Sequence, residues 1–416
     1  MILPSVAIWT ICAVAIAGVV VRPFRWPEAI WAMAGAAILV LAGLVAPAAA
    51  LGAVGRGLDV YLFLIGMMLL SETAREHGLF DWIAATAAIH ARGSSPRLFV
   101  LIYAAGIVTT TFLSNDATAV VLTPAVYAAA RKAKAEPLPL LFACALIANA
   151  ASFVLPISNP ANIVLYGGTM PPLGRWLASF ALPSIAAIGV TFVMLRWVER
   201  ARIAGTCAAD IARDKLSAGG KAALAGIVGT AALLLLASAF DTALGLPAAL
   251  AGTITTLGVC GIARRSPLVP FRSVSWSVLP LVAGLFVLVE ALTQTGVTAY
   301  VADLLRHASA DPVRGAALAG TALAFVCNAM NNLPAGLLAS IAVAQAEPAR
   351  IVTDALLIGL DLGPNLSITG SLATILWLQA IRREGEDVGF WQFLKIGTVT
   401  MVPALIAAIG ARLMLG

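Results

Sequence analysis

The sequence has little charge, few cysteines and few histidines. Charged residues make up 11% of its 416 residues, whereas a soluble domain has about 25%. Hydrophobic residues make up 61%, and the mean hydropathy is +0.97. These values exclude a soluble enzyme, a nucleic-acid-binding protein and a disordered protein. The five cysteines and three histidines follow no ligand spacing, so we expect no metal site, no disulfide framework and no cofactor.

Long apolar runs occupy most of the chain, and a membrane-spanning helix needs about 20 such residues. Two runs, 98–130 and 315–344, are broken near their middle by Ser114-Asn115-Asp116 and by Asn331-Asn332. A break of this kind must be buried in protein or face water. Each of these runs is therefore predicted to form a re-entrant hairpin. The other runs give about ten transmembrane helices, so the predicted fold class is an all-α polytopic membrane protein.

The basic residues predict the orientation of these spans. With the N-terminus outside, twenty of the 26 Lys and Arg lie in cytoplasmic segments, as the positive-inside rule requires. Both termini are then expected outside the plasma membrane. The polar segment 199–221 is expected to be a cytoplasmic linker.

The two halves of the chain resemble each other. Gly66, Glu72 and Gly78 recur as Gly284, Glu290 and Gly296, and the first broken tip recurs as the second. Residues 1–198 and 222–416 are therefore predicted to be inverted repeats, as in many secondary transporters. The first hairpin would open inward and the second outward. The short amphipathic segments 77–91 and 298–308 are predicted to lie at the bilayer surface.

Polar residues also interrupt the runs 138–167 and 352–378, together with Pro and Gly. Both runs are therefore predicted to be spans unwound at mid-membrane, which would bring four broken helices to one site. The cores of the four broken segments contain no Lys or Arg, whereas Asp116 and Asp361 suit a cation or a titratable proton. Two alternatives stay open: a lone Asn or Ser can simply join two helices, and Asp116 can cap a helix that starts at Ala117.

These segments resemble the arsenical pump membrane protein family of the ion transporter superfamily. The resemblance spans essentially the whole chain and rests on five motifs. They are Phe112-Leu113-Ser114-Asn115-Asp116-Ala117, Ser158-Asn159 followed by Asn162, Met330-Asn331-Asn332-Leu333-Pro334, Asp361-Leu362-Gly363-Pro364, and Gly370-Ser371-Leu372-Ala373-Thr374. Superfamily relatives often carry Ser-Asn-Thr at both tips. The different tips of this chain favour proton coupling over sodium coupling.

The resemblance implies export of arsenite, As(OH)3, and antimonite by proton antiport, through an elevator movement of a transport domain against a scaffold domain. The position of Asp116 at a hairpin tip makes it the expected proton carrier, with Asp361 in the opposed broken span as its rival. The resemblance also implies a substrate site made of Ser114, Asn115, Asp116, Ser158, Asn159, Asn162, Asn331, Asn332, Thr369, Ser371 and Thr374. Some family members bind a cytoplasmic ATPase subunit, and superfamily analogy gives a homodimer.

Two other functions stay open at this point. A sodium/proton antiporter of the same superfamily would use Asp116 and Asp361 to bind sodium. A dicarboxylate carrier would need cationic residues that the broken segments lack. An enzyme is not expected, because the sequence shows no pairing of a nucleophile with a base.

Overall fold

The computed structural model describes residues 2–167, 170–208 and 215–416. The regular secondary structure of this part of the chain is helical, apart from an isolated bridge between Ser94 and Thr206. Seven described helices are long and apolar enough to cross a membrane, and nine spans result if each of two bent pairs counts as one. Large apolar side chains such as Leu3, Ile254 and Ile406 are exposed on them, as expected of surfaces that face lipid. The chain is an integral membrane protein of the predicted all-α class.

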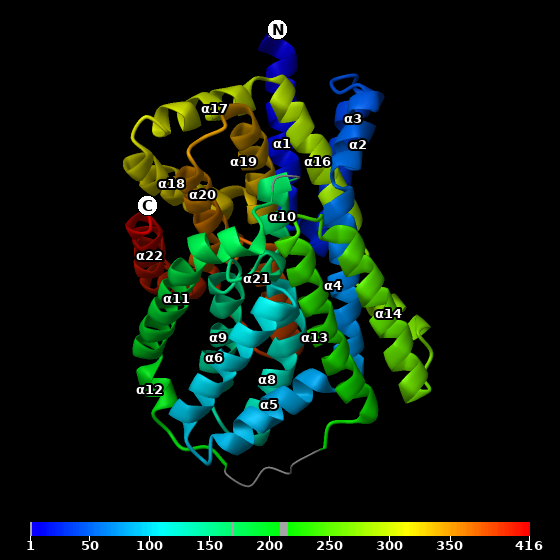
Figure 1. Cartoon of the computed structure of the whole chain (residues 1–416), viewed down its shortest axis with the longest axis vertical. Coiled ribbons are helices and arrows are strands. Elements are labelled where there is room, and N and C mark those ends of the chain that lie inside the picture. Colours follow the sequence, from blue (N-terminus) through cyan, green and yellow to red (C-terminus); the bar gives the residue numbers. More distant parts are fainter. Residues whose placement is uncertain (1, 168–169, 209–214) are drawn as a thin grey trace.

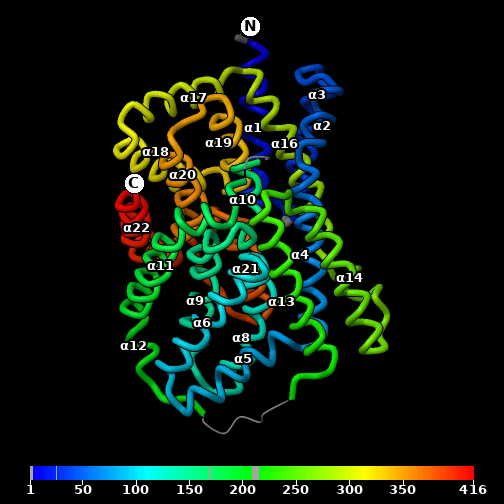
Figure 2. Tube along the Cα trace, viewed as in Figure 1, coloured from blue at the N-terminus to red at the C-terminus, as the bar shows by residue number. Residues whose placement is uncertain are grey.

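The helices form two groups that lie side by side (Figure 1; Figure 2). The first group contains α1 (Ile2–Val21), α2 (Glu28–Leu41), α3 (Pro47–Arg56), α4 (Leu58–Glu76), α13 (Ala218–Ala239), α14 (Gly245–Ala263), α15 (Leu268–Ser273) and α16 (Val278–Gln294). The second contains α6 (Ser95–Phe112), α7 (Asn115–Ala117), α8 (Thr123–Lys132), α9 (Pro137–Ala150), α10 (Pro160–Tyr166), α11 (Leu173–Val198), α12 (Arg200–Ile203), α18 (Pro312–Met330), α19 (Asn332–Ala346), α20 (Arg350–Leu362), α21 (Leu372–Arg383) and α22 (Phe390–Met414). Helix α4 packs along α14, α2 along α16, and α11 along α22. Each of these contacts joins the two halves of the chain.

Both predicted hairpins are present, and so are both unwound spans. Helix α6 returns through α7, a π-helical turn at Thr118–Leu122 and α8, and α18 returns through α19 after Asn331. Nine residues separate α9 from α10, and nine separate α20 from α21. In Figure 1 the first hairpin lies beside the arm helix α5 (Leu79–His90), and the second lies beside the arm helix α17 (Val297–Ala308) at the opposite end of the molecule.

Glycine sets the start of both arm helices. Gly78 precedes α5 with φ 73°, and Gly296 precedes α17 with φ 85°, a backbone conformation that glycine adopts without the cost of a Cβ. The chain turns sharply there, by 77° between α16 and α17. On α17, Leu305 is buried while Asp303 and Arg306 are exposed. These two helices match the predicted surface segments.

Glycine also allows two helix pairs to approach without side chains between them. A Cβ on Gly66 of α4 would collide with the backbone of α14, and a Cβ on Gly252 of α14 would collide with Gly66. In the second group, a Cβ on Gly359 of α20 would collide with the carbonyl oxygen of Gly320 of α18. We call the α18–α20 contact the glycine seam. Interior helices are close-packed, so neither pair accepts a methyl group without separating.

Candidate functional site

The first hairpin tip is capped by Ser114. Its Oγ accepts a hydrogen bond from the backbone N–H of Ala117 at 3.1 Å, and the helix begins at Asn115. The Asn115 Oδ1 accepts from the backbone N–H of Asp116 at 2.9 Å. The alternative that Asp116 is the cap is therefore wrong. A serine two residues earlier satisfies the helix N-terminus, and the Asp116 carboxylate accepts no hydrogen bond from a described residue.

Asp116 lines a small cavity between the hairpin and the first helix group. The cavity has a volume of about 50 Å³. Ser114 and Asp116 line it from the hairpin, Pro160 from α10, Leu376 from α21 and Glu72 from α4. None of the described residues that line it is a Lys or an Arg. The cavity therefore offers carboxylate and hydroxyl groups but no cation for an anionic substrate.

A polar vestibule of about 720 Å³ adjoins this cavity and shares part of its wall. Phe80 and Asp81 of α5 line it, so it lies toward the α5 end of the molecule. Its charged lining residues have both signs and are Arg22, Glu28, Glu72, Arg75, Asp81, Arg383 and Glu384. This balance of charge gives no strong attraction for either sign of ion.

The two unwound spans meet through Asn159 and Asp361. The Asn159 Nδ2 donates to Asp361 Oδ1 at 2.8 Å, while the Asn159 Oδ1 accepts from the Ala161 N–H at 3.0 Å and caps α10. Asp361 is fully buried, and its Oδ2 has no hydrogen-bond partner among the described residues. Asp361 therefore joins the two unwound spans through one carboxylate oxygen and leaves the other without a partner.

Asn162 and Ser158 hold the first unwound segment in place. The Asn162 Nδ2 donates to the carbonyl oxygens of Ser152, Leu155 and Pro156 at 2.9–3.3 Å, all within the break. Its Oδ1 is buried without a partner among the described residues. The Ser158 Oγ donates to the carbonyl oxygen of Thr111 at 3.0 Å, which ties the break to the first hairpin.

A second polar cluster joins α9 to the other break. The Asn149 Nδ2 donates to Asn365 Oδ1 at 3.0 Å and to Thr374 Oγ1 at 3.2 Å. Its Oδ1 accepts from Ser371 Oγ at 3.2 Å, and the Ser371 Oγ also accepts from the Thr374 N–H at 3.1 Å and so caps α21. All four residues are buried. In this conformation Ser371 and Thr374 join helices, which is the alternative that the sequence left open.

The second hairpin tip is held by the backbone of the second break. Asn331 has φ 75°, a strained conformation for a residue with a Cβ. The Asn332 N–H donates to the carbonyl oxygen of Gly370 at 2.9 Å, and the Asn331 Nδ2 donates to that of Thr369 at 3.4 Å. The Thr369 Oγ1 in turn donates to the carbonyl oxygen of Asn328 at 2.8 Å. Both tip asparagines are buried, and neither lines the small cavity or the vestibule. We call this tip closed in that sense.

The sequence analysis missed one buried ionic cluster. Asp354 is fully buried and accepts hydrogen bonds from Tyr166 Oη at 2.8 Å and from Arg412 Nε at 2.9 Å. Arg412 is 4% exposed, and Arg350 lies 3.7 Å from the same carboxylate. The cluster joins α10, α20 and α22 beside the site. The sequence signal that could have revealed this cluster was the carboxylate of Asp354 inside the apolar run 352–378.

Comparison with known proteins agrees with this architecture. The family model described as citrate transporter matches residues 10–363. An arsenical pump membrane protein of Escherichia coli is 30% identical over 83% of this chain and 84% of its own length. The arsenical pump membrane protein of Yersinia enterocolitica is 29% identical over the same shares. An uncharacterised transporter of Mycobacterium tuberculosis is 29% identical over 84% of this chain and 85% of its own.

Among solved structures, the crystal structure of the YdaH transporter of Alcanivorax borkumensis matches with a TM-score of 0.58 and 16% identity. The match covers 88% of this chain and 86% of that one, so the two proteins share a fold. The family model and the curated relatives each cover most of the chain. The protein therefore belongs to the family that the citrate transporter model describes and is a member of the arsenical pump membrane proteins.

Proposed function

We propose that this protein exports arsenite and antimonite by proton antiport. The observation that carries the proposal is Asp116, whose carboxylate accepts no hydrogen bond from a described residue and lines a cavity that has no basic side chain among its described lining residues. Arsenite is uncharged at neutral pH and bears three hydroxyls, so hydroxyl and amide groups such as those of Ser114 and Asn115 suit it. The arsenical pumps among the relatives support this choice of substrate.

Thiolates are not needed for this substrate and would hold As(III) too tightly for release. Cys144 and Cys327 lie near the broken segments, but both are buried, and the Cys327 Sγ donates to the carbonyl oxygen of Leu360 at 3.8 Å. Citrate, which the family model names, carries up to three negative charges. It would have no basic partner among the described residues that line the cavity at Asp116.

We further propose that residues 1–198 and 222–416 are inverted repeats and that the α5 end of the molecule is cytoplasmic. The linker 199–221 runs at that end, although residues 209–214 lie outside the described part of the chain. The vestibule then opens inward while the second tip is closed, so the conformation is inward-facing. Elevator movement, a homodimer and an ATPase partner stay predictions from the resemblance.

Arsenite uptake into inside-out membrane vesicles tests the function. With an acidic lumen we expect arsenite to accumulate against its gradient, because protons leave the lumen as arsenite enters. Sodium-free medium should not reduce the uptake. Vesicles without the carrier are the control. Uptake that requires a sodium gradient, or accumulation of citrate in place of arsenite, would favour one of the two alternative functions.

Cysteine labelling tests the orientation. Cys207, in the linker, is the one cysteine of the five that is not buried. An impermeant maleimide should therefore label the wild-type protein only after the cells are permeabilised. In a Cys207→Ser background, Ala310→Cys at the exposed end of α17 should be labelled in intact cells. The reverse pattern would overturn the proposed orientation.

A further inference from the structure

Glu72 lies where the small cavity meets the vestibule. Among the described residues it is the one titratable side chain that lines both spaces. It belongs to α4 of the first helix group, whereas Asp116 belongs to the first hairpin in the second group. A water-filled route from Asp116 to the vestibule along Glu72 would therefore offer a carboxylate that can take up and release a proton.

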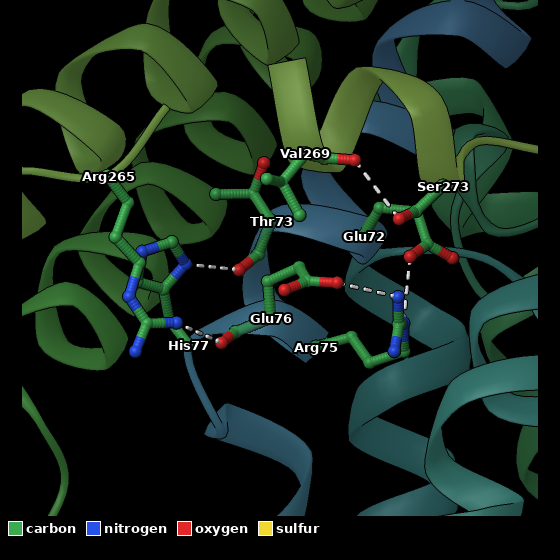
Figure 3. Close-up of polar contacts among 8 residues, drawn as sticks. All are labelled: Glu72, Thr73, Arg75, Glu76, His77, Arg265, Val269 and Ser273. Carbon is green, nitrogen blue, oxygen red and sulfur yellow. Dashed lines mark hydrogen bonds and ion pairs between the residues drawn. The ribbon is translucent and has the colours of Figure 1, made fainter. Parts of the chain in front are cut away.

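Arg75 allows Glu72 to change its protonation state. The Arg75 Nε donates to Glu72 Oε2 at 2.7 Å, and its Nη2 donates to Glu76 Oε1 at 2.9 Å, as Figure 3 shows. The guanidinium is thus shared by two carboxylates. When Glu72 is neutral, Arg75 keeps Glu76 as its counter-charge, so no cation is left unpaired in a partly buried place.

Other charged side chains line the vestibule together with Glu72. Arg22 Nε and Glu28 Oε1 form an ion pair at 3.0 Å. The remaining charged side chains of the vestibule lining, on α5 and around the end of α21, are Asp81, Arg383 and Glu384. In the small cavity, Asp116 is the other titratable group among the described lining residues. The volume of about 50 Å³ admits water, since one molecule needs roughly 10–15 Å³.

We propose that Glu72 is the proton relay between Asp116 and the cytoplasm. This inference rests on the proposed function. In the inward-facing state, neutral Asp116 gives its proton to a cavity water and keeps the electron pair of the broken O–H bond. That water passes one proton to the Glu72 carboxylate, and Glu72 then releases a proton to vestibule water. Water and Glu72 are restored, Asp116 becomes a carboxylate, and one proton reaches the cytoplasm.

Glu72→Gln tests the relay in inside-out vesicles. We expect proton-driven arsenite uptake to fall by about tenfold or more, because an amide cannot accept and release the proton at this step. Arsenite–arsenite exchange without a pH gradient should stay close to wild type, since exchange needs no net proton release. A merely structural role would lower both rates together. Glu384→Gln removes a carboxylate that lines the vestibule only and should leave both rates unchanged.

Glu72→Asp provides a second test of the relay. If Glu72→Gln fails to reach the membrane, Glu72→Asp keeps the carboxylate but lengthens the proton hop, so it should raise the solvent deuterium isotope effect on driven uptake. If Glu72→Asp changes neither the solvent isotope effect nor the rate of driven uptake, the relay would be overturned. A wild-type protein that does not respond to the pH gradient would refute the proposed function itself. If the pH gradient drives arsenite uptake equally well in the wild type and in Glu72→Gln, only the relay would be refuted.

Discussion

Asp116→Asn is expected to abolish proton-driven arsenite uptake into inside-out vesicles, down to the level of vesicles without the carrier. The amide keeps the size of the side chain, and the helix keeps its cap, because Ser114 and not Asp116 provides it. The loss would therefore come from the missing titratable group in the cavity. Arsenite exchange without a pH gradient should survive in part. Driven uptake and exchange measured on the same vesicles separate the two effects.

Asp81→Asn is the matched control, because Asp81 lines the vestibule but is not among the lining residues of the small cavity. Vesicles that contain Asp81→Asn should take up arsenite in response to the pH gradient as wild-type vesicles do. If Asp116→Asn still accumulates arsenite against its gradient, coupling belongs to Asp361 or to neither residue. Asp361→Asn in the same assay then decides between them, since the Asp361 Oδ2 is buried without a hydrogen-bond partner among the described residues.

Asp354→Ala is expected to lower the free energy of unfolding by about 3–5 kcal/mol, the usual cost of leaving a buried charge unpaired. Arg412 is 4% exposed and donates to this carboxylate from two nitrogens at 2.8 and 2.9 Å. Tyr166 Oη would also lose its hydrogen bond to the same carboxylate. Thermal unfolding of the purified protein in detergent measures the effect.

Asp387→Ala provides the comparison on the surface. Asp387 pairs with Arg382 at 2.7 Å, but both side chains are more than half exposed. Exposed pairs contribute about 0–1 kcal/mol, so this variant should melt close to wild type. Equal melting of the two variants would show that the buried cluster does not stabilise the fold.

The hairpins and the unwound spans could be predicted because each one leaves a strong local signal. An apolar run of about 30 residues with Asn and Asp at its centre cannot cross lipid as one helix. Gly78 and Gly296, which the sequence analysis used only as matching positions of the two halves, lie at the turns into α5 and α17. The sequence also placed Asp116 at a hairpin tip and Asp361 in the opposed broken span; in the structure Asp361 lies near the end of α20, just before the break.

Other features depend on distances that no local pattern encodes. Ser114 and Asp116 are both good caps, and the backbone alone decides which of them meets the free N–H groups. Asp354 and Arg412 are 58 residues apart, and Arg412 read as an ordinary basic residue at the end of the last span. Asn149 donates to two side chains of the other half of the chain, so its role in joining helices required the three-dimensional structure.

The glycine seam limits how the second hairpin can open. The backbones of α18 and α20 are in direct contact at Gly320 and Gly359. A tilt of α18 would break this contact, because no side chain lies between the two helices there. We therefore expect Asn331, at the end of α18, and Asp361, near the end of α20, to keep their separation if the hairpin moves. In that case α19 is the part of the hairpin that can change position. We expect a ligand bound between α19 and its neighbour α10 to restrict this movement, whereas the seam offers no space for a ligand.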